Sequence, residues 1–139
     1  MLYCYAGGMK LDTNSSLRHK TIMIADDELF FRKLLRDILE EEGYTVVAEA
    51  VDGIEAVERY CLHRPEITIM DIYMPGKNGI DAMKEILSLD KNAKVLICSG
   101  SGYDDDVNFA FKVGAKDAIL KPFIKKEVAE IINKVLNLK

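Results

Sequence analysis

Five short apolar runs recur along this chain at nearly even intervals, and a segment with the apolar spacing of a helix follows each of them. The runs begin near residues 21, 45, 67, 94 and 117, so successive starts lie 24, 22, 27 and 23 residues apart. One strand followed by one helix fills such an interval, and repeated strand–helix units favour a parallel sheet. The spacing therefore predicts an α/β fold with five parallel strands and helices on both faces.

The predicted strands are continuous apolar runs, as expected where helices cover both faces of a sheet. They are Thr21–Ala25, Thr45–Glu49, Glu66–Met70, Lys94–Cys98 and Asp117–Leu120. The first predicted helix covers Leu29–Glu42 and ends at Gly43, a residue type suited to the backbone turn that closes a helix. The apolar faces predicted for the five helices include Phe30, Ile54, Ile80, Phe111 and Ile124.

The length of 139 residues is that of one domain. We expect residues 20–139 to form this domain and residues 1–19, which are polar from residue 7 onward, to be a flexible N-terminal leader. No stretch is long and apolar enough to span a membrane, and the start of the chain lacks the pattern of a secretory signal. Membrane insertion is therefore not expected.

Charge and cysteine content narrow the possible functions. The chain has 19 Lys and Arg residues against 23 Asp and Glu residues, a net charge of −4, which argues against direct binding of nucleic acid. The basic residues near the C-terminus alternate with Glu127 and Glu130, as on a solvated helix face. Cys4, Cys61 and Cys98 have no C-x-x-C spacing, which favours reduced thiols in a cytoplasmic protein.

Polar residues with reactive side chains follow four of the five predicted strands. Asp26 and Asp27 follow the first strand, Asp71 the third, Ser99 the fourth and Lys121 the fifth. Ligands of open parallel sheets bind beyond the carboxyl ends of the strands, so these side chains are expected to converge there. Alone, each has an ordinary explanation as a helix cap, a turn residue or a solvated side chain.

The combination points to phosphoryl-transfer chemistry. Three carboxylates placed together repel one another unless a cation neutralises them, and Mg²⁺ prefers such oxygen ligands. A lysine and a hydroxyl group can contact phosphoryl oxygens, and an aspartate can accept a phosphoryl group as a nucleophile. Phosphoryl transfer depends mainly on positioning and charge neutralisation, which this set of residues supplies.

Four stretches resemble the receiver domain of two-component response regulators, and the resemblance covers residues 20–139. It implies a flavodoxin-like, doubly wound sheet in the order 2-1-3-4-5 with five helices. The D-x-x-M-P-x-x-x-G and K-P-F motifs, in this order and at this spacing, are its most specific features. The four stretches are Ile24–Glu28, Met70–Gly79, Ile97–Gly100 and Gly114–Phe123.

The resemblance also implies a metal site. Asp71 corresponds to the phosphoacceptor of the family. Asp26 and Asp27 correspond to its acidic pair, with Asp27 the direct Mg²⁺ ligand and Asp26 acting through water. Asp71 and the backbone carbonyl of Tyr73 complete the implied protein ligands.

Other residues correspond to the switch of the family. Lys121 and Ser99 match the lysine and the hydroxyl that contact the phosphoryl group, and Pro122 matches a proline that often follows a cis peptide bond. Ala118 departs from the family, which often has an aromatic residue there whose rotamer follows the switch hydroxyl. Tyr73 and Ser101 correspond to positions that flank the site and that, in the family, tune hydrolysis of the acyl phosphate.

The resemblance implies a signalling switch and not an enzyme that turns over an external substrate. A sensor histidine kinase or a phosphotransfer protein would phosphorylate Asp71, and an unidentified downstream protein would bind the altered surface. That surface comprises the predicted helix around Val107–Phe111, the strand Asp117–Leu120 and the last helix, from Ile124 to Val135.

Three other functions compete with this one. A haloacid-dehalogenase-type phosphatase needs a second acid two residues after its nucleophile, where this chain has Tyr73. A binder of flavin mononucleotide needs a phosphate loop after the first strand, where Asp26 and Asp27 would repel phosphate. A receiver fold that is no longer phosphorylated and serves as a scaffold is the third alternative.

Overall fold

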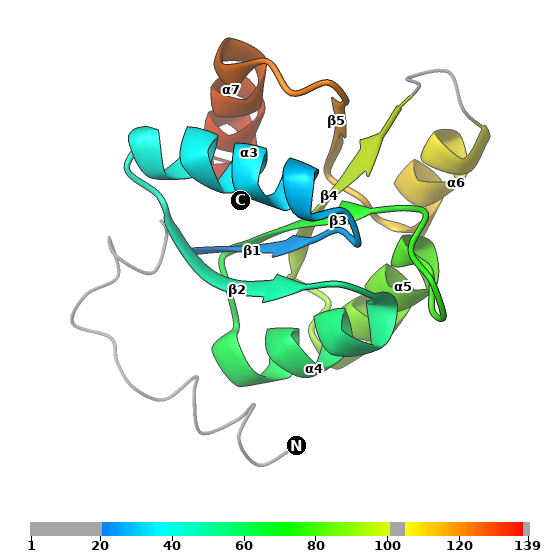
Figure 1. The fold of residues 1–139 in the computed structure, drawn as a ribbon. Helices are drawn as coiled ribbons and strands as arrows, with labels where there is room; N and C mark the ends of the chain where they lie inside the picture. Colours follow the sequence, from blue (N-terminus) through cyan, green and yellow to red (C-terminus); the bar gives the residue numbers. More distant parts are fainter. Residues whose placement is uncertain (1–20, 101–104, 138–139) are drawn as a thin grey trace.

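The computed structural model describes residues 21–100 and 105–137. Five parallel strands form one sheet in the order β2-β1-β3-β4-β5, as the resemblance implied, with five helices around it (Figure 1). The leader predicted over residues 1–19 and Ser101 lie outside the described residues. The strands are β1 (Thr21–Ala25), β2 (Thr45–Ala50), β3 (Ile67–Asp71), β4 (Lys94–Ser99) and β5 (Asp117–Leu120).

Three strands, β2, β3 and β4, end one residue later than predicted, and for β3 and β4 this changes the position of a candidate site residue. Asp71 is the last residue of β3, and Ser99 is the last residue of β4. Backbone pairing explains the difference, because Asp71 is in register with Cys98 and Ser99 with Leu120. Both residues are therefore fixed by the sheet itself and not by a loop that follows it.

One helical layer consists of α3 (Leu29–Glu41) and α7 (Lys125–Leu136). Both helices cover the same face of the sheet, where they enclose one of two apolar clusters (Figure 1). Leu35 and Leu39 of α3 pack in this cluster with Val128 and Ile132 of α7, over Ile69 in the central strand. Apolar residues at intervals of three and four thus point one side of each helix at the sheet.

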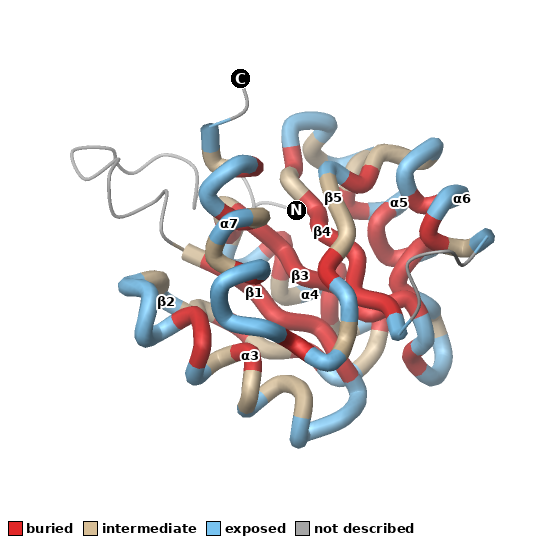
Figure 2. The backbone as a smooth tube through the Cα atoms, turned by 90° about the horizontal axis from the view of Figure 1, so that it is seen from above, coloured by how far each residue is buried: buried red, intermediate tan, exposed pale blue. Residues whose placement is uncertain are grey.

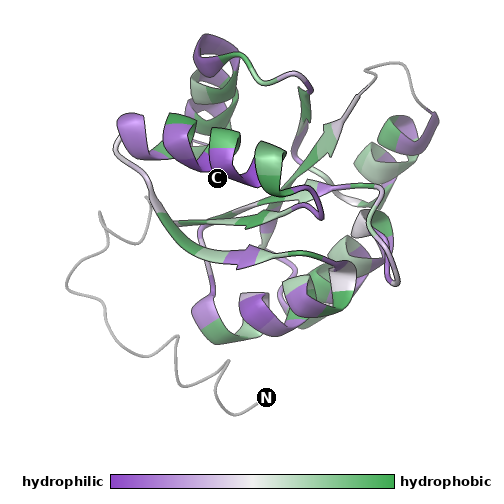
Figure 3. Ribbon diagram, viewed as in Figure 1, coloured by the Kyte–Doolittle hydropathy of each residue, from purple (hydrophilic) through white to green (hydrophobic). Residues whose placement is uncertain are grey.

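The other layer consists of α4 (Gly53–His63), α5 (Gly79–Leu89) and α6 (Asp105–Val113). These helices pack on the second apolar cluster, to which they contribute Tyr60, Met83 and Ala110, respectively, and which also includes Met70 of β3. The buried residues follow the strands through the centre of the molecule, and exposed residues lie on the outer sides of the helices (Figure 2). The helices carry both hydrophobic and hydrophilic residues, whereas the strands are mainly hydrophobic (Figure 3).

Several residues predicted on apolar helix faces are instead exposed. Phe30 is 70% exposed, and Ile54, Phe111 and Ile124 are also exposed. Phe30 and Ile54 lie in the first turns of their helices, and Ile124 precedes α7, so these three residues lie at the ends of segments whose later turns supply the buried residues. The helical period identifies a face, but burial also requires a strand beneath that turn.

Gly43 ends the first helix as predicted. Its φ of 90° lies in the left-handed region, its backbone N–H donates to the carbonyl of Glu40, and the N–H of Tyr44 donates to Leu39. These paired bonds satisfy carbonyl groups at the end of α3. Within the described part of the chain, no helix is long and apolar enough to cross a membrane.

Candidate functional site

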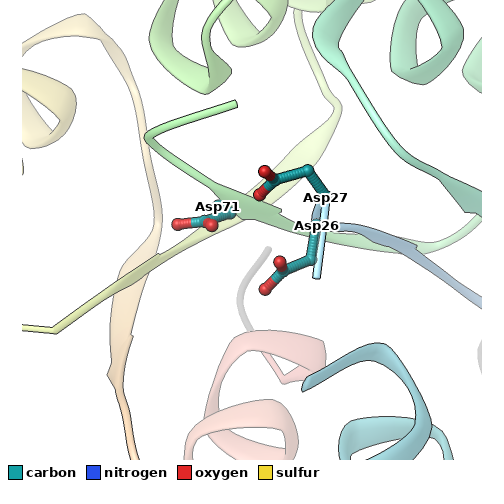
Figure 4. Close-up of side chains that lie close together, drawn as sticks. All are labelled: Asp26, Asp27 and Asp71. Carbon is teal, nitrogen blue, oxygen red and sulfur yellow. The ribbon is translucent and has the colours of Figure 1, made fainter. Parts of the chain in front are cut away.

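Three aspartates meet where β1 and β3 lie side by side. Asp26 and Asp27 directly follow β1, and Asp71 ends β3. The carboxylate oxygens that these three side chains can offer to a metal all lie within 4.8 Å of one another (Figure 4). The structure therefore brings together the acidic residues that the sequence predicted as a cluster.

The surroundings of Asp26 fix its position. The residue is buried, and its Oδ1 accepts a hydrogen bond of 2.8 Å from the backbone N–H of Glu28. Its backbone carbonyl accepts a bond of 2.7 Å from the guanidinium group of Arg32, and its N–H donates to Ala50. Asp26 is thus held at both backbone polar groups and at its side chain, whereas Asp27 is exposed.

Lys121 places a positive charge between the two buried carboxylates. Its Nζ lies 2.9 Å from Asp26 Oδ2 and 3.3 Å from Asp71 Oδ2. The same nitrogen lies 4.1 Å from the centre of the Phe31 ring, a favourable cation–π geometry. Burial alone would lower the pKa of Lys121, but the hydrogen bond to Asp26 and the charge of Asp71 outweigh it and raise that pKa.

The pKa of Asp71 is raised above its ordinary value. Burial is the largest cause, and the charge of Asp26 adds to it. Lys121 and a hydrogen bond from the backbone of Tyr73 act in the opposite direction without cancelling the effect. Asp71 therefore lies at a site where additional positive charge would be stabilising.

The remaining predicted residues surround Asp71 from other elements. Ser99 is buried at the end of β4, and its carbonyl accepts a 2.9 Å bond from the N–H of Lys121. Tyr73 follows Asp71 by two residues, and its side chain is exposed. The Lys121–Pro122 peptide bond is cis, as the resemblance suggested. Ala118 lies in β5, partly buried against the second apolar cluster.

Gly79 is a positioning residue whose role was missed in the sequence, although it ends the D-x-x-M-P-x-x-x-G motif. A Cβ atom there would lie 1.9 Å from the carbonyl oxygen of Asp71, closer than any side chain allows. The N–H of Gly79 donates a 2.8 Å bond to the carbonyl of Ile72. The start of α5 is thus packed directly against the backbone of the phosphoacceptor candidate, an approach that only glycine permits.

These residues together could hold a hard cation. Three carboxylates face one another and one lysine offsets part of their charge, so a divalent cation with oxygen ligands would relieve the remaining repulsion. Asp26, Asp27 and Asp71 could supply carboxylate ligands. The donor set fits Mg²⁺, which typically binds one or two protein carboxylates together with water and phosphate oxygens.

Comparisons with known proteins agree with this geometry. The sequence model of the family described as "Response regulator receiver domain" matches residues 22–133. The chain is 50% identical over 116 residues to the chemotaxis protein CheY of Thermotoga maritima, which covers 84% of this chain and 97% of that protein. It is 47% identical to the chemotaxis protein CheY of Bacillus subtilis, with the same coverage.

A solved structure resembles the whole described fold. The crystal structure of the CheX–CheY–BeF3–Mg²⁺ complex from Borrelia burgdorferi contains a chain that superposes with a TM-score of 0.81 at 35% identity. The match covers 86% of this chain and 90% of that chain. The curated relatives therefore share the sequence of most of this chain, and the solved neighbour shares its fold.

Proposed function

The chain belongs to the response regulator receiver domain family, and we propose that it is a switch that is turned on by phosphorylation of Asp71. The phosphoryl donor is a sensor histidine kinase or a phosphotransfer protein. One observation carries the assignment: Asp26, Asp27 and Asp71 offer oxygens within 4.8 Å of one another, and the ammonium group of Lys121 lies against two of them. Signalling by phosphoryl transfer is a property that the family implies.

In the proposed transfer, an oxygen of the Asp71 carboxylate attacks the phosphorus atom of a phosphohistidine. A phosphorus–oxygen bond forms while the bond from phosphorus to the imidazole nitrogen breaks, and that nitrogen keeps the electron pair and takes up a proton from water. Lys121 neutralises negative charge on the phosphoryl oxygens, and the Ser99 hydroxyl donates a hydrogen bond to one of them. The product is an acyl phosphate on Asp71.

Asp26, Asp27, Asp71 and the carbonyl of Tyr73 are the residues that would hold Mg²⁺, with Asp26 acting through water. When bound, the ion would neutralise charge on the phosphoryl oxygens. The raised pKa of Asp71 and the close carboxylates support this assignment, because each is relieved by a cation. The solved complex of a similar chain with BeF3 and Mg²⁺ also supports it.

The proposed signalling surface comprises α6, β5 and α7. Large apolar side chains are exposed there, namely Phe109 and Phe111 of α6, Leu120 of β5 and Ile124 before α7. Such residues are suited to a protein partner whose binding changes with phosphorylation. This assignment makes the chain a switch that acts through protein contacts rather than an enzyme that turns over an external substrate.

Mass spectrometry of the intact protein after incubation with acetyl phosphate tests the assignment. We expect wild type to gain one phosphoryl group when Mg²⁺ is present, and Asp71→Ala and Asp71→Asn to gain none. Asp37→Asn is the matched control, because Asp37 is an exposed aspartate of α3 outside the site, and this variant should be labelled like wild type. Absence of labelling in wild type under all conditions would overturn the switch and favour the scaffold alternative.

A further inference from the structure

Helix α6 is attached to the rest of the molecule by few buried side chains. Of its nine residues, Val107 and Ala110 are buried, while Phe109 and Phe111 are exposed. Elements with little buried apolar surface open and reorient at low cost in free energy. A single polar contact to such a helix can therefore change its position or order measurably.

Such a contact reaches α6 from the phosphoacceptor segment. The phenol of Tyr73 donates a hydrogen bond to a carboxylate oxygen of Asp106, which lies in the first turn of α6. The Tyr73 side chain is 55% exposed, so this bond helps to orient a ring that lies at the surface. Asp106 is half-buried, and its negative charge suits the N-terminal end of a helix.

The backbone around Tyr73 is held firmly on the side of the acidic cluster. The N–H of Tyr73 donates a hydrogen bond to Asp71, and the preceding residue, Ile72, accepts the bond from Gly79. The carbonyl of Tyr73 belongs to the proposed metal ligands. One residue therefore contacts the acidic cluster through its backbone and α6 through its side chain.

Position 118 offers no comparable link in this chain. Ala118 of β5 has a methyl side chain, which has neither a polar atom nor alternative rotamers. It packs against the second apolar cluster. A connection between the acidic cluster and α6 is therefore better supplied by the Tyr73–Asp106 pair than by β5.

We propose that the hydrogen bond between Tyr73 and Asp106 couples occupation of the acidic site to the order of α6. Holding the phenol places the Tyr73 carbonyl for Mg²⁺, and a bound ion in turn holds the start of α6 through the same residue. Coupling of this kind is reciprocal, so each event strengthens the other by the same factor. The inference rests on the proposed function, because it takes the acidic cluster as the Mg²⁺ site.

Titration of the full chain with MgCl₂, followed by nuclear magnetic resonance, measures the coupling. Tyr73→Phe removes only the hydroxyl group, and we expect it to weaken Mg²⁺ binding about five- to tenfold, the lower end of ordinary couplings between two sites. Asp106→Ala should weaken binding similarly, and combining it with Tyr73→Phe should add little. Asp106→Asn retains an acceptor and should lie between wild type and Asp106→Ala.

Two matched controls separate this contact from other effects. Asp105→Ala removes the same charge from the same turn, so it reports the long-range effect of charge on Mg²⁺ binding. In the cation–π contact between α5 and α6, Lys84 Nζ lies 5.1 Å from the centre of the Phe109 ring. Lys84→Met removes this contact and so weakens the attachment of α6 at a point outside the acidic cluster. Both controls should bind Mg²⁺ more tightly than Tyr73→Phe.

Hydrogen exchange provides the second measurement. Adding Mg²⁺ should slow exchange of α6 amides in wild type, and this protection should be lost in Tyr73→Phe. If Tyr73→Phe binds Mg²⁺ like wild type and keeps the protection of α6, the coupling is wrong and the metal site stands. If wild type itself binds no Mg²⁺, the coupling and the proposed metal site both fail.

Discussion

Asp26 and Asp71 are two buried carboxylates that share one ammonium group. The distances from Lys121 Nζ are 2.9 Å to Asp26 and 3.3 Å to Asp71, so the lysine lies nearer to the residue that is not the proposed phosphoacceptor. Removing one partner of a buried ion pair usually costs several times more than the pair contributes when complete. The complete cluster is therefore expected to add little to the stability of the fold, although removing one of its members would be costly.

Thr68 is a buried polar residue whose hydroxyl group is not satisfied by a hydrogen bond within the described part of the chain. It lies fully buried in β3, and its hydroxyl group has no hydrogen-bond partner among the described residues. A buried hydroxyl without a partner loses its bonds to water and gains none in return, which costs about 1–3 kcal/mol. Thr68 is thus a polar side chain among the apolar residues Ile67, Ile69 and Met70 of β3.

We predict that Thr68→Val raises the free energy of unfolding by about 1 kcal/mol, because valine has nearly the same shape without the unsatisfied group. Urea denaturation followed by circular dichroism measures the change. Thr68→Ser is the control, since it keeps the hydroxyl and loses a methyl group, and it should be less stable than wild type. A Thr68→Val protein less stable than wild type would show that the hydroxyl is hydrogen-bonded.

At the scale of elements, the turn from β3 into α5 positions the phosphoacceptor candidate. Gly79 begins α5 within van der Waals distance of the Asp71 backbone, and Gly53 begins α4 in the same close manner against Lys77. The backbone N–H of Gly53 donates a 3.0 Å hydrogen bond to the carbonyl of Lys77. The first residues of α4 and α5 thus both contact the loop that joins β3 to α5.

Gly79→Ala should destabilise the protein by roughly 2–3 kcal/mol, because the added methyl group must displace backbone and not a flexible side chain. The same variant should also label more slowly with acetyl phosphate, since the shift moves Asp71. Gly100→Ala is the matched control, as a Cβ atom there meets nothing within 4 Å. Equal stability of the Gly79→Ala protein and wild type would contradict the close approach.

Glu49 connects the edge strand β2 to α3. Its two carboxylate oxygens accept bonds of 3.0 Å from Arg32 and 2.7 Å from Arg36. Burial alone would raise the pKa of Glu49, but the bonds from the two arginines outweigh it and hold that pKa below the ordinary value of 4.5. The folded state therefore favours the charged form of Glu49 more than the unfolded state does.

This shift predicts the direction of a pH dependence. The stabilisation by Glu49 is fully present above its unfolded pKa and is lost as the pH falls through the lower folded pKa. The difference in unfolding free energy between wild type and Glu49→Gln should therefore shrink as the pH falls from about 5 to about 3. Urea denaturation across this range measures it, and a difference that is independent of pH would contradict the ion pairs.

At the scale of the whole molecule, the order of the strands creates the site. The chain runs from β1 outward to β2 and then returns to β3 on the other side of β1, so residues 26 and 71 become neighbours. This reversal leaves the carboxyl ends of β1 and β3 open to ligands. The clustering of negative charge from Asp26, Asp27 and Asp71 at this edge therefore depends on the strand order of the complete sheet.

Binding of Mg²⁺ at this edge should stabilise the entire fold. At a free concentration ten times its dissociation constant, the ion should raise the free energy of unfolding by about 1.4 kcal/mol, because it binds only the folded state. Urea denaturation with and without MgCl₂, at matched ionic strength with NaCl, measures the effect. Asp27→Asn removes an exposed ligand without leaving a buried charge unpaired, and it should reduce the gain. An equal gain from NaCl alone would contradict a specific site.

The family and the positions of the five strands followed from the amino-acid sequence alone. Apolar runs with β-strand length and regular spacing leave few alternatives to a parallel sheet, and residues at the ends of its strands must share one edge. Asp26, Asp27, Asp71, Ser99 and Lys121 could therefore be predicted together, although they are distant in the chain.

Only the tertiary structure decided the contacts that depend on distances between elements. The hydrogen bond from Tyr73 to Asp106 and the approach of Gly79 to Asp71 join different elements of the fold. The helical and strand periods of the sequence predict each element by itself and not the contacts between elements. The exposure of Phe30 likewise depends on how the first turn of α3 packs against the rest of the molecule. Periodicity is a local property of the chain, whereas burial and side-chain pairing depend on packing between distant segments.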